Sequence, residues 1–80
     1  MIQQILRLPN VISDTGLSRS TIYLRISQGL WPKPVSLGAR AVGWPATEVE
    51  AVNAARIAGK SDDEIQELIT KLEMARKAIA

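Results

Sequence analysis

The stretch LSRSTIYLRISQG at residues 17–29 decides the fold that we expect for this chain. Ile22 and Ile26 lie four residues apart, so they share one face of a helix, and Leu17 points inward with them. The rest of the segment carries mostly polar side chains. The pattern therefore predicts an amphipathic helix over residues 18–28 whose apolar stripe lies on the core.

Residues with capping properties mark both ends of this predicted helix. The hydroxyl of Ser18 can accept a hydrogen bond from a backbone N–H of the first turn, and Gly29 suits the position just after the last turn. Gly16 can take a positive φ, which permits a tight turn before the helix. A short helix over residues 9–15 should precede that turn, because Pro9 fits the start of a helix. Two helices joined in this way are typical of a helix-turn-helix.

The outward side of the second helix is rich in groups that bind nucleic acids. Hydroxyls, a phenol and guanidinium groups can bind phosphates and base edges, and Arg19 or Arg25 could bind a guanine through two hydrogen bonds. Alternatively, this face only meets solvent, and Tyr23 closes the edge of the core. The candidate residues in this segment are Ser18, Arg19, Ser20, Thr21, Tyr23 and Arg25.

A β-hairpin is predicted over residues 35–44, where apolar and polar side chains alternate on both arms around a loop at 38–41. Pro32 and Pro34 make the chain leave the preceding helix in an extended conformation. A hairpin in this place is a wing. Arg40 near its tip could reach a DNA backbone or minor groove, or could simply be solvated. Lys33 is a further candidate for a DNA phosphate.

Two more helices are expected, near residues 45–58 and 62–79. Pro45 starts the first, and Ser61 and Glu64 have the spacing of a capping box at the start of the second. An apolar stripe at helical spacing runs along the last helix. The stripe packs back on the domain, pairs with a second chain, or belongs to a partly free tail. Its members are Ile65, Leu68, Ile69, Leu72, Ala75 or Arg76, and Ile79.

Composition narrows the class of protein. The 80 residues make one small domain, and a chain of this length hides only roughly 60–65% of its unfolded surface. The chain has no Cys and no His, which excludes disulfides, zinc fingers and histidine-based catalysis. No stretch resembles a signal peptide or a membrane span. We therefore expect a cytoplasmic protein that is no enzyme and holds no metal or cofactor.

Charge is unevenly distributed along the chain. Residues 1–44 carry five basic side chains against Asp14 alone, a net charge of +4, whereas residues 45–80 carry five basic and seven acidic side chains, a net charge of −2. A basic front and an acidic rear orient a molecule toward a polyanion, although chance can produce such an asymmetry in a short chain.

The order and spacing of several motifs resemble the AlpA family of small phage and prophage regulators. The resemblance covers roughly residues 5–52, and its specific pieces are SRSTIY at 18–23 and AVGW at 41–44. It implies a fold similar to the winged helix-turn-helix of MerR-type domains and excisionases. The remaining motifs are RLP (7–9), TGL (15–17), Gly29, PKPV (32–35), LG (37–38), Arg40 and EV (48–49).

Two positions depart from the family pattern. Family members often carry an aromatic residue where this chain has Val52. The pair Leu24-Arg25 departs from a common arrangement in which the second position is apolar, so Arg25 lies either on the groove side or at the edge of the core. The segment from Lys60 onward is outside the resemblance, and its role rests on its periodicity.

The expected fold is thus mainly α: a small winged helix-turn-helix of the MerR type over residues 5–59, with one β-hairpin wing. An extra C-terminal helix over residues 60–80 serves packing or dimerisation. The predicted core consists of Leu8, Ile12, Leu17, Ile22, Ile26, Val35, Val42, Trp44 and Val49.

The resemblance implies a sequence-specific DNA-binding regulator of a phage, prophage or other mobile element. Such regulators activate or repress element genes, often affecting integrase expression and excision. The helix at residues 18–28 would enter the major groove, and the wing at 38–41 would contact the backbone or minor groove. The alternatives are an excisionase-like architectural factor and an interaction module that recruits a recombinase. The expected partner is double-stranded DNA, with homodimerisation through the last helix and contact with a recombinase or RNA polymerase also open.

Overall fold

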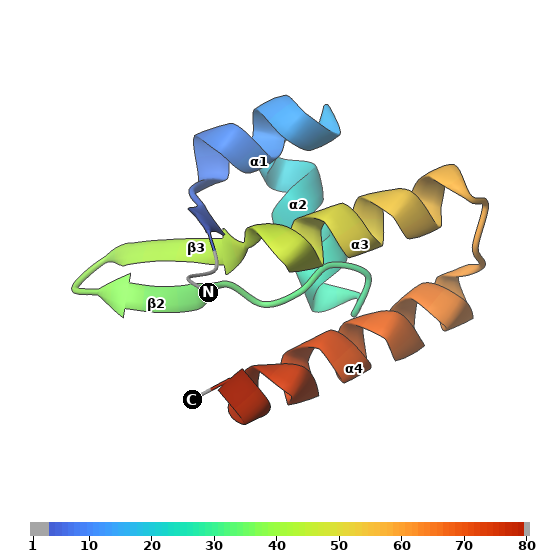
Figure 1. Cartoon of the computed structure of the whole chain (residues 1–80). Helices are drawn as coiled ribbons and strands as arrows, with labels where there is room; N and C mark the ends of the chain where they lie inside the picture. Colours follow the sequence, from blue (N-terminus) through green and yellow to red (C-terminus); the bar gives the residue numbers. More distant parts are fainter. Residues whose placement is uncertain (1–3, 80) are drawn as a thin grey trace.

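The computed structural model describes residues 4–79 of the chain, and its side chains up to Lys77. Four helices surround a small antiparallel sheet of three strands in this described part (Figure 1). The fold is mainly α with a helix-turn-helix and a hairpin wing, as predicted. The elements in chain order are β1 (Ile5–Leu6), α1 (Leu8–Thr15), α2 (Arg19–Ser27), β2 (Val35–Gly38), β3 (Ala41–Pro45), α3 (Ala46–Ile57) and α4 (Asp62–Ile79).

The sheet has the strand order β1-β3-β2, so β3 is its central strand. β2 and β3 form the predicted hairpin, in which Val35 lies opposite Gly43, and a β-bulge interrupts the pairing between Ser36 and Gly38. β1 pairs with the other edge of β3 and places Leu6 opposite Trp44. β1 therefore ties the start of the chain to the wing and positions α1 beside it.

The ends of α1 and α2 follow the capping residues. Gly16 has φ of 73° in the turn between the helices, and the Ser18 hydroxyl accepts a hydrogen bond from the Thr21 N–H at 3.2 Å. After α2, Gly29 has φ of 75°, and the Leu30 N–H bonds the carbonyl of Arg25 at 2.8 Å. These bonds satisfy backbone groups that a helix end otherwise leaves unpaired. α2 is therefore one residue shorter at each end than the predicted helix over 18–28, because Ser18 and Gln28 are its cap residues.

One hydrophobic core joins all four helices to the sheet. Of the residues predicted for it, Ile22, Trp44 and Val49 are buried, whereas the leucines and isoleucines at positions 8, 12, 17 and 26 are half-buried and pack against it. The whole buried cluster is Leu6, Val11, Ile22, Leu30, Trp31, Trp44, Val49, Val52, Ile65 and Ile69.

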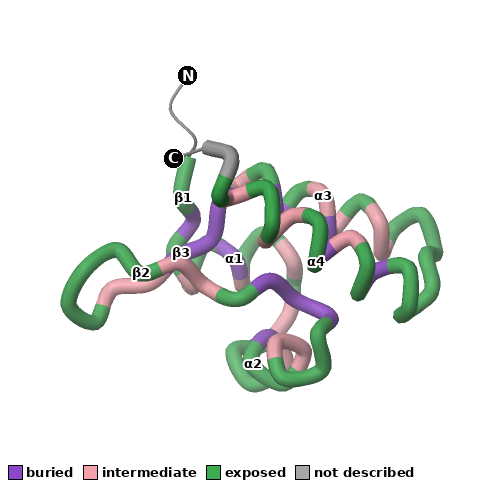
Figure 2. Tube along the Cα trace, turned by 90° about the horizontal axis from the view of Figure 1, so that it is seen from below, coloured by how far each residue is buried: buried purple, intermediate pink, exposed green. Residues whose placement is uncertain are grey.

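The prediction that Val35 and Val42 belong to the core was wrong. Both are half-buried and lie outside the buried cluster. The reason is the geometry of the hairpin, which projects from the body so that its outer part has few elements to pack against (Figure 2). The alternation of apolar residues correctly indicated strands, but not a covered face.

The segment between α2 and β2 is anchored by two tryptophans. Trp31 is buried, as expected for an anchor, and the indole N–H of Trp44 donates to the carbonyl of Pro32 at 2.8 Å. Trp44 is fully buried in the same cluster as Val52. Trp44 therefore remains buried although this chain has a valine at position 52 of α3, where family members often have an aromatic residue. This segment links the end of α2 rigidly to the wing.

α4 packs along α3 and buries the apolar stripe seen in the sequence. Ile65 and Ile69 are buried, Leu68 and Leu72 are half-buried, and the side chain of Ile79 lies outside the described residues. The capping box at the start of α4 is formed: the Ser61 hydroxyl accepts from the Glu64 N–H at 3.2 Å, and the Glu64 carboxylate accepts from the Ser61 N–H at 3.2 Å. Within one chain, Ile65 and Ile69 of the stripe thus pack back on the domain.

Candidate nucleic-acid interface

The outer face of α2 is the centre of the candidate interface. Ile22 points into the core, and the opposite side of the helix meets solvent. The side chains exposed on that side combine hydroxyls, a guanidinium, a phenol and one large apolar group. They belong to Arg19, Ser20, Tyr23, Leu24 and Ser27.

Two of the predicted hydroxyls hold the start of α2 in place. The Ser18 Oγ atom accepts from the Thr21 N–H and lies 2.9 Å from the Thr21 Oγ1 atom. Ser18 and Thr21 therefore shape the first turn, and any contact they make with a ligand comes in addition to that pairing. Ser20, between them in sequence, is exposed.

Arg19 and Tyr23 form a pair on the exposed side of α2. The Arg19 guanidinium carbon lies 5.8 Å from the centroid of the Tyr23 ring, within the range of a cation–π contact. Tyr23 is 40% exposed, so part of its side chain meets solvent. The contact holds a cation and a phenol hydroxyl side by side, and both groups can bind phosphates or base edges.

Arg25 and Lys33 lie at the margins of this face. Arg25 is half-buried, which places it at the edge of the core rather than on the outer side of α2. The side chain of Lys33 is exposed, while its backbone is held from α4: its N–H donates to Glu73 at 2.8 Å, and its carbonyl accepts from Arg76 at 2.7 Å. Lys33 thus extends from a fixed piece of backbone.

Arg40 lies in the turn of the wing and is exposed. The turn is built from residues with positive φ, 104° at Gly38 and 47° at Ala39. Behind it, a Cβ atom at Gly43 would come within 2.6 Å of the Ile5 side chain and 2.9 Å of the Leu6 carbonyl oxygen. Glycine is therefore needed there for β1 to pair with the hairpin that carries Arg40.

α2 and the hairpin project from the body that α3 and α4 form (Figure 2). α4 reaches only the C-terminal end of α2, where the Gln66 amide donates to the Gln28 carbonyl at 3.0 Å. The N-terminal half of α2, which carries most of the candidate residues, keeps its outer side exposed. α2 and the hairpin thus each present an exposed surface outside the α3–α4 body.

Ion pairs divide the described cations into two groups. Arg56, Lys60 and Arg76 each pair with a carboxylate, whereas the four candidate cations form no ion pair, and neither do Arg7, Lys71 and Lys77. Unpaired cations remain available to a polyanion, and paired ones are partly neutralised. The unpaired candidates are Arg19, Arg25, Lys33 and Arg40.

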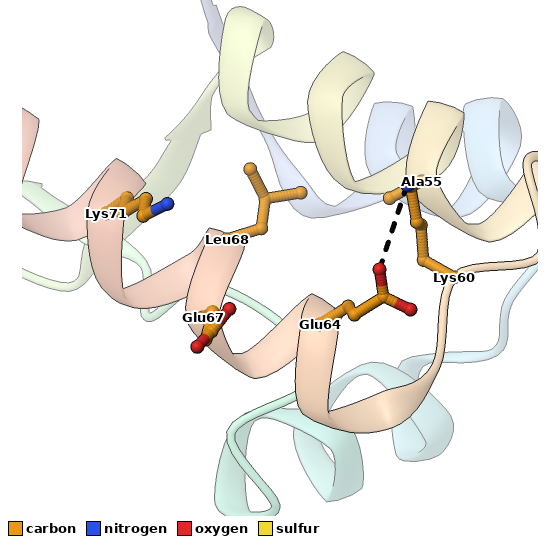
Figure 3. Close-up of a pocket in the computed structure, with 6 residues that line it drawn as sticks. All are labelled: Ala55, Lys60, Glu64, Glu67, Leu68 and Lys71. Atoms are coloured by element: carbon orange, nitrogen blue, oxygen red, sulfur yellow. Dashed lines mark ion pairs between the residues drawn. The ribbon is translucent and has the colours of Figure 1, made fainter.

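A pocket of about 220 Å³ lies elsewhere, between α3 and α4 (Figure 3). It is lined by Ala55 and Leu68 and by charged side chains, including the Lys60–Glu64 pair at 3.7 Å. No residue of α2 or of the wing lines it, so it is separate from the candidate interface. The described residues contain no cluster of three or more His, Cys, Asp or Glu side chains suited to a metal. Nor do they include a helix long and apolar enough to cross a membrane.

Comparison with protein families places these elements in a known context. The family model described as prophage CP4-57 regulatory protein (AlpA) matches residues 4–57, from the residue before β1 to the end of α3. This chain belongs to the AlpA family. The matched region contains both α2 and the wing, whereas α4 lies beyond it.

Two known proteins are similar to this chain in sequence. The uncharacterised protein ORF88 of Enterobacteria phage P4 is 50% identical over 58 residues, which cover 72% of this chain and 66% of the phage protein. The DNA-binding transcriptional activator AlpA of Escherichia coli K12 is 40% identical over 53 residues, covering 59% of this chain and 76% of that protein. This chain therefore spans slightly less than two thirds of the phage relative. No solved structure matched it.

The sequence-based site left out Leu24. The sequence does contain a signal for its exposure, because Leu24 is two residues from both Ile22 and Ile26. Each step of two residues turns an α-helix by roughly 200°, so Leu24 must face away from the core that these isoleucines enter. An apolar side chain thus lies within the candidate interface on the outer face of α2.

Proposed function

We propose that this chain is a sequence-specific DNA-binding transcription regulator of a phage, prophage or other mobile element. In this proposal α2 enters the major groove, and the wing turn at residues 38–41 contacts the backbone or minor groove. The observation that carries the proposal is the AlpA-family match over residues 4–57, because that region includes both elements. One relative in the comparison is named a DNA-binding transcriptional activator.

The geometry of α2 supports this use. A major groove of B-DNA admits one α-helix, and an entering helix reads bases through the side chains on its outer face. Here that face is free of intramolecular cover and presents Arg19, Ser20 and Tyr23. Lys33, on the segment after α2, and Arg40, in the wing turn, are further exposed cations for phosphates.

Sequence readout is favoured over a purely architectural role. An excisionase-like factor can rely on backbone contacts and on the deformability of DNA, whereas a promoter-specific regulator must distinguish base edges. The polar groups on the outer face of α2 suit the second task. We expect no catalytic activity, since the exposed groups of this face bind and orient rather than form a constellation of acid, base and nucleophile.

The test is a parallel binding assay on two duplexes of the element that encodes the protein, its integrase promoter and its attachment site. We expect tight binding to the promoter that exceeds binding to random DNA, and a larger loss of promoter affinity than of random-DNA affinity in Arg19→Ala. Lys71→Ala on α4 removes one positive charge far from α2 and is the matched control; it should bind as the wild type does.

Two other outcomes would redirect the assignment. Binding and bending confined to the attachment site would favour the excisionase-like role. Absence of binding to either duplex above random DNA would favour an interaction module that recruits a recombinase. Sedimentation of the free protein and of the complex would also establish whether it acts as a homodimer.

A further inference from the structure

Leu24 is an exposed apolar side chain in the middle of the polar outer face of α2. It is 57% exposed. Ser20 precedes it by four residues and Ser27 follows it by three, so all three lie along one side of the helix. Because Ser20 and Ser27 are short, the Leu24 side chain extends further from the helix axis than either of them.

The exposure of one leucine is ordinary on a protein surface, and by itself it indicates no function. Its position distinguishes Leu24. Ile57 at the end of α3 is even more exposed, at 82%, but it does not belong to α2. Leu24 instead shares its side of the molecule with Arg19, Ser20 and Tyr23, the groups proposed to meet base edges.

The chemistry of the major groove supplies one apolar partner for such a side chain. Each base pair presents hydrogen-bond donors and acceptors there, and thymine alone adds a methyl group. A leucine pressed against a donor or acceptor would remove that group from water without a hydrogen bond, which is unfavourable. Against a methyl group, the same leucine removes apolar surface of both partners from water.

We propose that Leu24 is a specificity-determining residue that recognises the 5-methyl group of a thymine in the major groove. This inference rests on the proposed function, since it requires α2 to occupy that groove. It adds a preference for a T·A pair at the position facing the middle of α2. Hydrogen-bonding residues at either end of the same face would read the flanking pairs.

The experiment replaces single thymines by uracil, which lacks the methyl group and keeps the same hydrogen-bonding edge. A duplex is first selected by the full-length protein from a random library, and each thymine is then replaced in turn. For the wild type, we expect one or two replacements to weaken binding about fourfold, the factor that corresponds to ~0.8 kcal/mol for one buried methyl group. In Leu24→Ala the same replacements should change binding less than twofold.

Ile57→Ala is the matched control, because it truncates an exposed apolar residue outside α2 and should retain the wild-type response to uracil. Thermal melting should give the same Tm for Leu24→Ala and the wild type, since Leu24 makes no contribution to the buried cluster. If Leu24→Ala nevertheless fails to fold, Leu24→Met keeps an apolar group of similar volume and should retain the response to uracil, whereas Leu24→Gln should lose it.

The failures of the two proposals are distinguishable. If no sequence is enriched from the library, the proposed function itself fails. If a sequence is enriched but every uracil replacement is neutral in the wild type, or equally harmful in Leu24→Ala, then Leu24 does not recognise a thymine methyl. The inference is overturned by either result, and the exposed leucine would then meet solvent or a protein partner.

Discussion

The guanidinium of Arg76 near the end of α4 binds both carboxylate oxygens of Glu48 in the first turn of α3. The Nε atom lies 2.9 Å from Oε2 and an Nη2 atom 2.6 Å from Oε1, while the same nitrogen donates to the Lys33 carbonyl at 2.7 Å. The side chain of Glu48 is only 6% exposed. Glu48 lies inside the AlpA-family match and Arg76 outside it, so a helix beyond the family region neutralises a buried charge within it.

Removing Arg76 should therefore destabilise the fold more than neutralising Glu48. Arg76→Met leaves the Glu48 carboxylate buried without a counter-charge, and we expect a loss of about 3 kcal/mol in the free energy of unfolding. Glu48→Gln should cost less, because the Arg76 side chain is 21% exposed and can turn toward water. The measurement is urea denaturation of both variants beside the wild type.

A double variant separates the charge effect from packing. Glu48→Leu combined with Arg76→Met removes both charges, and its stability should return to within about 1 kcal/mol of the wild type. If the double variant is instead about as unstable as Arg76→Met alone, the loss of the ion pair rather than the unpaired charge of Glu48 destabilises that variant, contrary to this expectation.

The apolar stripe of α4 should contribute to the stability of one chain. Ile65 is fully buried, so Ile65→Ala removes apolar contacts and leaves a cavity, at a cost of about 3 kcal/mol. Met74→Ala on the exposed side of α4 is the control and should be nearly neutral. Thermal melting and sedimentation check both variants. A dimeric wild type that Ile65→Ala converts to a monomer with unchanged Tm would assign the stripe to dimerisation.

The capping box of α4 predicts a pH-dependent difference in stability. The Ser61 backbone N–H, then the Ser61 hydroxyl and the Lys60 charge, holds the pKa of Glu64 below its ordinary value of 4.5. A lowered pKa in the folded state stabilises the fold above the unfolded pKa, and this contribution is lost as the pH falls through the folded value. Wild type should exceed Glu64→Gln in stability at pH 7, and the difference should shrink as the pH falls through the lowered pKa of Glu64.

Glu67→Gln is the control for this pH effect, because Glu67 is exposed one turn further along α4. It should show little difference from the wild type between pH 7 and pH 3 in the same melting experiment. A difference in stability between wild type and Glu64→Gln that is the same at pH 3 as at pH 7 would contradict this prediction. It would mean that the amide packs or forms hydrogen bonds less well than the carboxyl group.

Local signals made the helix ends predictable from the sequence. Ser18 caps α2 through an N–H only three residues away, and Gly16 and Gly29 adopt positive φ within single turns. Each of these interactions depends on near neighbours, so the residue types alone indicate it. The same holds for the Ser61–Glu64 capping box, which formed as its spacing predicts.

Contacts between distant segments were less predictable. The burial of the Glu48 carboxylate depends on Arg76, a partner 28 residues away on another helix. Leu6 and Leu30 belong to the buried cluster although they lie in short segments without a helical or strand period. Periodicity reports which face of an element is apolar, and it does not report which outside elements complete the core.

The candidate interface was partly predictable, because helical periodicity indicates which face of α2 is exposed. Helical spacing correctly placed Arg19, Ser20 and Tyr23 on exposed positions of α2. The sequence could not decide between two positions for Arg25, and the half-buried side chain lies at the edge of the core. The hydrogen bond between the Ser18 and Thr21 hydroxyls was also not predictable from the sequence, because either hydroxyl alone could have pointed outward.

The unpaired cations predict how DNA binding depends on salt. Each phosphate contact releases counterions and contributes about −0.9 to the slope of log K against log of the salt concentration. Arg19, Lys33 and Arg40 are fully available, which gives a slope of about −2.7 if each meets a phosphate, and about −3.6 if the half-buried Arg25 also reaches one. Mobility shifts at several salt concentrations measure this slope.

Arg40 provides the sharpest test of the wing. If it contacts the backbone, Arg40→Ala should weaken binding to the selected site and to random DNA by the same factor and flatten the slope by about 1. Lys71→Ala carries the same change in net charge on α4, so it controls for the overall field and should leave the slope unchanged. An Arg40→Ala slope equal to that of the wild type would mean that Arg40 is solvated in the complex. A loss of affinity for only some sequences would instead indicate a minor-groove contact that depends on the width of the groove.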